Sequence, residues 1–352
     1  MPPLLDYAIH VTEALSDAAM HTVFGRDVRE RPVLAPTPRD VVMRDGAAQV
    51  YRFRRPAGAP EAPRDPLLVI PSMINKWYVL DLRARSSFIE ALVNAGIETY
   101  CLDWGTARDE DRYVTWDDVI DRIARVARFV RRSAGVERLG VLGYCMGATL
   151  SGIYTALEPE RVAALVNLAG PFDFSKAGVL GHMVQPGWFD AAAIAEAGNV
   201  APIQMQQGFQ AMRPTLNFSK LIGYLDRMKD RSARDSFYAI ETWGNDNIPF
   251  PAAAYATYIR ELYQENALVK KQHRVKGRLV DLGRITCPVL TIGADRDTIC
   301  PKAAALGLNH HCGSKDVSEL HVPGGHVGAV VGSRAAHDLY PATAKWLRER
   351  LT

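Results

Sequence analysis

Short apolar runs alternate with stretches of helical periodicity over most of this chain. The run Leu67–Pro71 is apolar throughout, which is typical of a strand buried on both faces of a parallel sheet. Further strands are predicted over Ala48–Arg55, Ile97–Leu102, Leu139–Leu142, Val162–Leu168, Pro288–Ile292 and Val317–Val322. The stretches between them predict helices: Leu80–Ala95, Met146–Leu157 and Ala335–Arg350. This alternation predicts an α/β fold with a doubly wound, mostly parallel sheet covered by helices.

One further helix carries its own start signal. Thr115 is followed three residues later by Asp118, a spacing that resembles a capping box. Apolar residues then recur on one face of the expected helix: Val119, Ile123, Val126 and Val130. We therefore expect a helix that starts after Thr115 and packs this stripe on the sheet.

Two regions depart from the strand–helix rhythm. Residues 1–40 combine an amphipathic helix over Leu5–Phe24 with an Arg/Pro-rich connection through Arg39, typical of an edge segment or a partner contact. Residues 173–282 are helical and aromatic-rich, with no evident strand, and they interrupt the sheet pattern. The predicted organisation is an N-terminal segment (1–40), a core (41–172 and 283–352) and an inserted helical cap (173–282). Aromatic residues such as Trp188 and Phe189 are expected to help this cap cover the core.

Composition narrows the classes of protein that fit. With 48% apolar and 23% charged residues among 352, the chain is an ordinary globular protein rather than a disordered or collagen-like one. A formal net charge of +3 without a Lys/Arg block argues against nucleic acid as a partner. No apolar run reaches the roughly 18 residues of a membrane span, and the acidic residues Asp6, Glu13 and Asp17 do not fit a signal peptide. A cytoplasmic location is expected.

The five cysteines lie scattered without CxxC spacing. They therefore predict neither a structural zinc site nor a secreted disulfide framework, and we expect no metal and no cofactor. One of them stands in a special context. Gly143-Tyr144-Cys145-Met146-Gly147 follows an apolar strand and precedes a helix, as a nucleophile elbow does.

Cys145 is the candidate nucleophile of this elbow. At a helix N-terminus the positive end of the helix dipole favours a thiolate, and the backbone N–H of Met146 is placed to bind an oxyanion during acyl transfer. The flanking glycines allow strand and helix to approach closely. The alternative interpretation is a buried Cys in a tight turn.

A nucleophile of this type needs a base and an acidic residue that orients the base. In α/β-hydrolase topology these follow in the chain order nucleophile, Asp, His, on loops at the carboxyl ends of strands. Asp297 follows the strand Pro288–Ile292, and His326 lies in a glycine-rich loop after the next strand. Asp295 is an alternative to Asp297 as the acid. The alternative interpretation of His326 is a purely structural role.

The second oxyanion donor should come from the loop after Leu67–Pro71. Ile74 is the candidate, through its backbone N–H. A plain packing role for Ile74 is the alternative, because a backbone donor leaves no side-chain signature.

Several segments together carry a family resemblance. They are Ile74-Asn75-Lys76-Trp77-Tyr78-Val79-Leu80-Asp81-Leu82, Asp103-Trp104-Gly105, Gly143-Tyr144-Cys145-Met146-Gly147, Trp243–Pro249 and Gly324-Gly325-His326-Val327-Gly328. From about Asp40 to the C-terminus the chain resembles the polyhydroxyalkanoate (poly-3-hydroxybutyrate) synthases, and in length it resembles their short catalytic subunits. Two positions depart from that family's pattern. Ala148 replaces the last glycine of G-x-C-x-G-G, and Thr298 replaces a His after the acidic residue.

The resemblance implies an acyltransferase that polymerises 3-hydroxyacyl-coenzyme A into polyester through an acyl thioester on Cys145, with His326 and Asp297 completing the triad. It also implies a growing polyester chain, a second synthase subunit, a homodimer and a position at polyester granules. The cap would keep water from the acyl-enzyme. The alternatives are a Cys-dependent α/β-hydrolase or thioesterase on the same fold, and a non-catalytic granule or scaffold protein.

Overall fold

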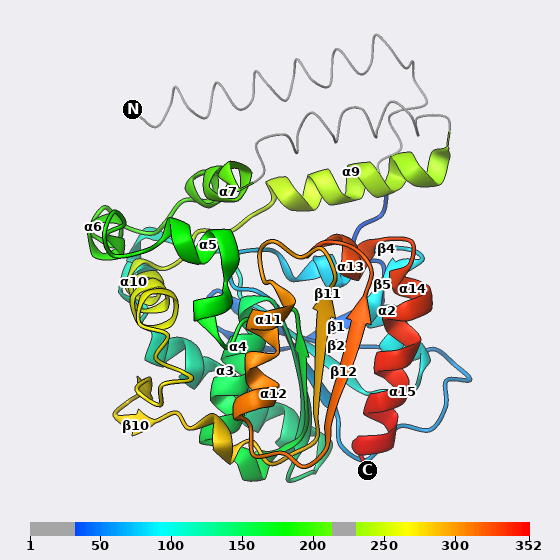
Figure 1. The fold of residues 1–352 in the computed structure, drawn as a ribbon. Helices are drawn as coiled ribbons and strands as arrows, with labels where there is room; N and C mark the ends of the chain where they lie inside the picture. The colour runs from blue at the N-terminus through cyan, green and yellow to red at the C-terminus, as the bar shows by residue number, and fades with distance from the viewer. Residues whose placement is uncertain (1–31, 213–229) are drawn as a thin grey trace.

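The computed structural model describes residues 32–212 and 230–352, so the predicted helix Leu5–Phe24 lies outside the described residues. An eight-stranded sheet runs through the centre in the order β1-β2-β6-β3-β7-β8-β11-β12 (Figure 1). The strands are β1 Arg39–Asp45, β2 Ala48–Phe53, β3 Leu67–Ile70, β6 Thr99–Asp103, β7 Leu139–Tyr144, β8 Val162–Leu168, β11 Val289–Ala294 and β12 Val317–Val322. The strands β6, β3, β7, β8, β11 and β12 pair in parallel, and β2 and β1 extend the β6 edge in antiparallel pairing. The predicted doubly wound, mostly parallel α/β sheet is confirmed.

Helices cover both faces of the sheet because its central strands are apolar on both sides. Every residue of β3, β7, β8 and β11 is buried. Helices α3 Trp116–Ala134 and α4 Met146–Leu157 pack on one face, and α2 Phe88–Asn94 and α15 Tyr340–Arg350 pack on the other (Figure 1). Two apolar cores result, one on each side of the sheet.

The predicted helix Leu80–Ala95 is wrong in its first half. Its start is occupied by the end of a short 3-10 helix (Trp77–Leu80) and by two short strands, β4 Asp81–Arg83 and β5 Ser86–Ser87, before α2 begins. Asp81 is fully buried and accepts hydrogen bonds from the hydroxyl groups of Thr37 (2.7 Å) and Ser87 (2.6 Å). This tertiary network holds the segment in a tight hairpin, which helical periodicity could not indicate.

Three smaller corrections concern the ends of the chain and the inserted segment. The connection predicted through Arg39 ends in a strand, because β1 finds its hydrogen-bonding partners on β2. The predicted helix Ala335–Arg350 is split at Leu339 into α14 Ala335–Asp338 and α15. Residues 173–282, expected to lack strands, contain a short hairpin of two strands with two residues each, β9 Arg274–Val275 and β10 Arg278–Leu279.

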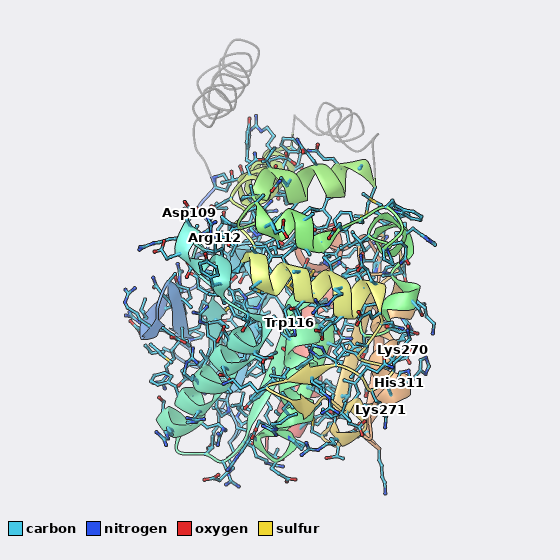
Figure 2. The ribbon with its side chains drawn as sticks, turned by 90° about the vertical axis from the view of Figure 1, so that its left-hand side faces the viewer. Asp109, Arg112, Trp116, Lys270, Lys271 and His311 are labelled. Atoms are coloured by element: carbon cyan, nitrogen blue, oxygen red, sulfur yellow. The ribbon has the colours of Figure 1, made fainter. Side chains whose placement is uncertain are left out.

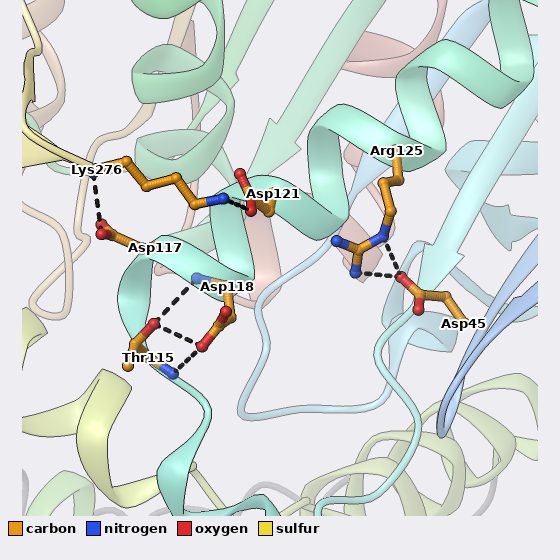
Figure 3. Close-up of polar contacts among 7 residues, drawn as sticks. All are labelled: Asp45, Thr115, Asp117, Asp118, Asp121, Arg125 and Lys276. Atoms are coloured by element: carbon orange, nitrogen blue, oxygen red, sulfur yellow. Dashed lines mark hydrogen bonds and ion pairs between the residues drawn. The ribbon is translucent and has the colours of Figure 1, made fainter.

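Helix α3 starts at the predicted capping box (Figure 3). The hydroxyl of Thr115 accepts the backbone N–H of Asp118 at 3.2 Å, and the Asp118 carboxylate accepts the N–H of Thr115 at 2.9 Å. Farther along, Arg125 binds the Asp45 carboxylate at 2.6 Å, and Lys276 pairs with Asp121. These contacts tie α3 to β1 and to the β9–β10 hairpin.

Most helices of the segment between β8 and β11 lie toward the carboxyl ends of the strands, the direction in which β11 and β12 point (Figure 1). The β9–β10 hairpin of the same segment lies lower, where Arg278 contacts the C-terminal end of α4. The described helices of this segment are α5 Gly178–Met183, α6 Ala191–Glu196, α7 Pro202–Ala211, α9 Arg231–Asn245, α10 Ala252–Thr257 and the π-helix η6 Tyr258–Gln264. The α10–η6 run crosses the start of α3, where Trp116 stacks on Tyr258 with 5.3 Å between ring centroids (Figure 2). Across residues 32–212 and 230–352, no helix is long and apolar enough to cross a membrane.

Candidate active site

Cys145 occupies the sharp turn between β7 and α4. Its backbone has φ 56° and ψ −129°, a conformation that side-chain-bearing residues rarely adopt. The turn needs its glycines, because a Cβ on Gly147 would lie 2.1 Å from the carbonyl oxygen of Ile70, and one on Gly143 would lie 2.2 Å from Cα of Ala148. The thiol is therefore presented at the N-terminus of α4, partly exposed. This is the geometry expected of a nucleophile elbow.

Asp297 and His326 meet in the interior although 29 positions separate them in the chain. Oδ2 of Asp297 lies 2.7 Å from Nδ1 of His326, and the Asp297 side chain is fully buried. Its other oxygen accepts the backbone N–H groups of Ile299 and Cys300, each at 2.9 Å. Asp295, the alternative acid, is exposed. The carboxylate is thus fixed by three hydrogen bonds, one with the imidazole and two from backbone N–H groups.

The imidazole of His326 is coupled to the Cys145 thiol. Burial disfavours the charged ring, but interactions with a Cys145 thiolate and with Asp297 outweigh it and raise the pKa of His326 to about 10. Nε2 of His326 is buried and has no hydrogen-bonding partner within the described part of the chain, while Cys145 is among the groups that raise the pKa of the ring. The arrangement favours the proton on the ring whenever the thiolate forms.

The ring of Tyr144 packs against one face of the His326 imidazole. Its ring stacks on that of His326 with 5.3 Å between centroids and an angle of 24°, and it is buried with 2% exposure. Sequence reasoning missed this residue. Its position inside the elbow motif, next to the nucleophile, was the available signal.

The two predicted oxyanion donors lie on segments that touch each other. Met146 is the first residue of α4, so its N–H is one of the free donors at the helix N-terminus. The loop carrying Ile74 starts at Pro71, whose carbonyl oxygen would be 2.5 Å from a Cβ on Gly147. The carbonyl of Ile74 itself accepts the N–H of Ile248 at 3.2 Å. The role of Ile74 as an oxyanion donor stays a prediction.

The segments that carried the family resemblance come together around this loop. Trp243 donates its indole N–H to the carbonyl oxygen of Lys76 at 2.8 Å, and Tyr78 donates its hydroxyl to Asp246 at 2.9 Å. Further bonds in the same region join Asn75 to Asn247, Lys76 to Thr106 and Trp104 to Pro71. Residues 243–248 of the inserted segment therefore hold the loop after β3 in place.

Two tyrosines of η6 form a second group that sequence reasoning missed. Tyr258 and Tyr263 are 7% and 5% exposed, and their rings meet at 5.3 Å. Burial, together with the nearby Cys145 and Cys300 thiols, raises the pKa of both hydroxyls well above its usual range. They belong to the inserted segment and lie near enough to Cys145 for its charge to act on their hydroxyls. By contrast, Trp188 is 72% exposed, so the expectation that it covers the core is wrong.

The two departures from the family pattern are accommodated. The Cβ of Ala148 faces Gly170, where an added Cβ would lie only 2.4 Å away, so the glycine opposite makes the room that Ala148 needs. Thr298 is half-buried, and the bond between Asp297 and His326 is present beside it. Within the described ranges, no group of three or more His, Cys, Asp or Glu side chains is placed to hold a metal ion.

Comparisons with known proteins agree with this geometry. Residues 65–331 match the alpha/beta hydrolase fold family, and residues 24–92 match the poly-beta-hydroxybutyrate polymerase (PhaC) N-terminus family. Among solved structures, a lipase candidate from Sulfolobus solfataricus shares the fold with a TM-score of 0.58, at 15% identity over 91% of this chain and 97% of that chain.

Sequence relatives are more specific. The poly(3-hydroxyalkanoate) polymerase subunit PhaC of Allochromatium vinosum is 33% identical over 89% of each chain. The protein of the same name from Haloarcula marismortui is 30% identical over 93% of this chain and 70% of its own. The expected resemblance is confirmed: this chain has the α/β-hydrolase fold and belongs to the poly(3-hydroxyalkanoate) polymerase subunit PhaC family.

Proposed function

We propose that this chain is an acyltransferase that polymerises 3-hydroxyacyl groups from coenzyme A thioesters into polyester and releases coenzyme A. The observation that carries the proposal is the buried 2.7 Å bond between Asp297 and His326, with the free side of the imidazole coupled to Cys145 in a strained elbow. Membership of the polymerase family supports the same substrate class.

In the first half-reaction, Nε2 of His326 takes the Cys145 proton and the thiolate attacks the thioester carbonyl carbon. The negative charge that develops on the carbonyl oxygen is stabilised by the N–H groups of Met146 and Ile74. When the tetrahedral intermediate collapses, its bond to the coenzyme A sulfur breaks and the leaving thiolate takes the proton from His326. The acyl group then rests on Cys145 as a thioester.

In the second half-reaction, the hydroxyl of another acyl unit or of a chain end attacks this thioester. His326 takes the hydroxyl proton, the new ester C–O bond forms, and the C–S bond breaks to return Cys145 with that proton. Asp297 orients the ring and stabilises its positive charge in both steps. A thioester is reactive enough for attack by an alcohol, provided that water is kept away.

The inserted segment supplies this exclusion through the buried Tyr258 and Tyr263 beside the elbow. We also propose that the chain works as a homodimer with a second synthase subunit at the surface of polyester granules. The Allochromatium vinosum relative, matched over 89% of its length, is a polymerase subunit by name, which supports a partner of this kind.

The test supplies 3-hydroxybutyryl-coenzyme A to the purified chain and measures free thiol and insoluble polymer together. Both products are expected. Cys145→Ala should release no coenzyme A, whereas Cys312→Ala, which changes another partly exposed thiol, should behave as wild type. Free thiol with soluble acid would instead indicate a hydrolase or thioesterase, and neither product from the folded chain, with or without a partner subunit, would indicate a scaffold.

A further inference from the structure

A basic pocket lies at the opposite end of the sheet from Cys145. It measures about 480 Å³, and its lining is formed by the last turn of α3, the turn into β7 and the turn before β8. The residues that line it are Arg128, Arg131, Arg132, Gly135, Val136, Glu137 and Arg161. We propose that this pocket binds a small phosphate-bearing anion at a site separate from the acyl-transfer centre.

The pocket carries an excess of positive charge that the protein does not neutralise. Arg161 pairs with Glu137 at 2.6 Å. The other three arginines have no carboxylate partner within residues 32–212 and 230–352. Four guanidinium groups thus share one carboxylate. Because like charges gathered around a concave surface repel one another, an anion bound there would relieve the repulsion.

Neighbouring arginines show that this lack of partners is particular to the pocket. On the same helix, Arg122 and Arg125 both contact the carboxylate of Asp45, at 3.4 and 2.6 Å. Arg138, just beyond the turn, lies 3.7 Å from Asp65. Each of these neighbouring arginines thus has a carboxylate partner, whereas the four arginines of the pocket have Glu137 alone.

Capping of the helix end does not account for these arginines. Gly135 adopts a left-handed conformation with φ 68°, and its N–H contacts the carbonyl oxygens of Arg131 and Arg132. The N–H of Val136 also bonds to the Arg131 carbonyl, at 3.0 Å. The backbone thus satisfies these terminal carbonyls itself. An interaction of an exposed cation with the helix dipole is weak and requires no pocket.

Arg131 adds an unsatisfied donor. One of its terminal nitrogens donates to the carbonyl oxygen of Glu137 at 3.2 Å, which holds the side chain across the turn. Its Nε–H is buried and finds no acceptor within the described part of the chain. Because this nitrogen is closed off from solvent, an anion in the pocket would contact the terminal nitrogens of the guanidinium group instead.

The chemistry of the lining fits phosphate groups. Guanidinium forks bind phosphate oxygens in bidentate fashion, and a volume of about 480 Å³ falls in the range of small-molecule sites. The pocket lies before Leu139, at the amino end of β7, whereas Cys145 follows its carboxyl end. Six strand residues at about 3.3 Å each place roughly 20 Å of protein between the two sites. The phosphate belongs either to a free molecule or to a lipid headgroup.

The experiment titrates the full-length protein with inorganic pyrophosphate by calorimetry and, in a second arm, measures co-sedimentation with vesicles of phosphatidylglycerol against vesicles of phosphatidylcholine. The test variant is Arg128→Gln/Arg132→Gln. The matched control is Arg125→Gln, which changes an arginine of the same helix that faces Asp45 instead (Figure 3).

We expect wild type and the control to bind with similar affinity and the double variant to bind at least tenfold more weakly. Binding to pyrophosphate assigns the pocket to a free anion, and binding only to the anionic vesicles assigns it to a headgroup. If wild type binds neither probe, or if test and control variants weaken equally, the proposal is overturned. Matching denaturation midpoints show that the variants are folded, and the wild-type titration is decisive without them.

Discussion

At the scale of single residues, two carboxylates two positions apart have opposite surroundings. Asp297 is buried and holds His326 through one oxygen and two backbone N–H groups through the other, whereas Asp295 lies at the surface. A carboxylate with three hydrogen bonds in the interior is fixed in position. An exposed one is free to move and is screened by water.

This contrast gives a matched pair of substitutions. Asp297→Asn should reduce coenzyme A release by about 10²–10⁴-fold, the usual contribution of acid–base catalysis, because the amide neither orients the imidazole correctly nor stabilises its charge. Asp295→Asn should stay within about twofold of wild type, as exposed substitutions do. Initial rates are compared at equal thermal stability. Greater damage from Asp295→Asn would show that the acid has been wrongly assigned.

At the scale of elements, the elbow depends on α4 approaching the end of β3. Gly147 makes that approach possible, since an added Cβ would meet the carbonyl oxygens of Ile70 and Pro71 at 2.1 and 2.5 Å. The neighbouring Ala148 finds its room against Gly170. The helix is thus held against the loop that carries the predicted oxyanion donor Ile74.

Gly147→Ala should therefore lower the free energy of unfolding by about 1–3 kcal/mol, the range for overpacking a tight interior. It should also reduce acyl transfer, because relieving the clash moves α4 and Cys145. Gly208→Ala is the control, since its added Cβ meets nothing within 4 Å and lies inside α7, where Ala is favoured. Urea unfolding measures the stability of both variants, and coenzyme A release measures their acyl transfer. Equal stability of the two variants would contradict the packing argument.

The π-helix η6 is a second element with a testable anchor. Glu261 on η6 lies 2.8 Å from Nδ1 of the fully buried His273, and this hydrogen bond lowers the pKa of Glu261. A carboxyl group whose pKa is lower in the folded state stabilises the fold above its unfolded pKa, about 4.3. That contribution is lost as pH falls through the lower folded value.

Wild type should consequently be more stable than Glu261→Gln at pH 7, and the difference should shrink as pH falls from about 5 to 3. Glu265→Gln, which changes an exposed carboxylate just past the same helix, should show no such pH-dependent difference. Denaturation midpoints across this pH range provide the measurement. A difference that grows at acid pH would refute the assigned role of the Glu261–His273 bond.

At the scale of the whole molecule, the inserted segment and the core meet at the loop after β3. The indole N–H of Trp243 and the carboxylate of Asp246 bind the backbone of Lys76 and the hydroxyl of Tyr78. The same segment continues through α10 into η6, which places two buried tyrosines beside Cys145. We therefore expect water exclusion and the positioning of the predicted oxyanion donor Ile74 to depend on this one interface.

Trp243→Phe tests this interface, since it removes the 2.8 Å bond to Lys76 but keeps an aromatic ring. If the hydrogen bond that positions the loop contributes about 1 kcal/mol to transition-state stabilisation, its loss corresponds to roughly a fivefold lower rate of acylation. Looser closure should also raise the ratio of free 3-hydroxy acid to polymer. Trp188→Phe, at a site 72% exposed, should change neither quantity. An unchanged rate and product ratio in folded Trp243→Phe would argue against the interface having this role.

The sequence by itself determined the local features of this protein. Helix α4 and strand β8 have the predicted bounds, and α3 starts at the predicted cap, because a continuous apolar run or a capping box carries its signal within a few residues. Strand β12 has the predicted bounds as well, although its sequence is mixed. The glycines around Cys145 likewise marked the elbow.

Only the tertiary structure decided what depends on contacts between distant residues. The buried Asp81 network turned a predicted helix into a hairpin, and the choice between Asp295 and Asp297 became visible once burial and the bond to His326 were known. Tyr258 and Tyr263 owe their place beside Cys145 to the packing of η6, and nothing in their local sequence signals it. Periodicity reports which face of an element is apolar, whereas the partner of each side chain is set by the three-dimensional packing of elements far apart in the chain.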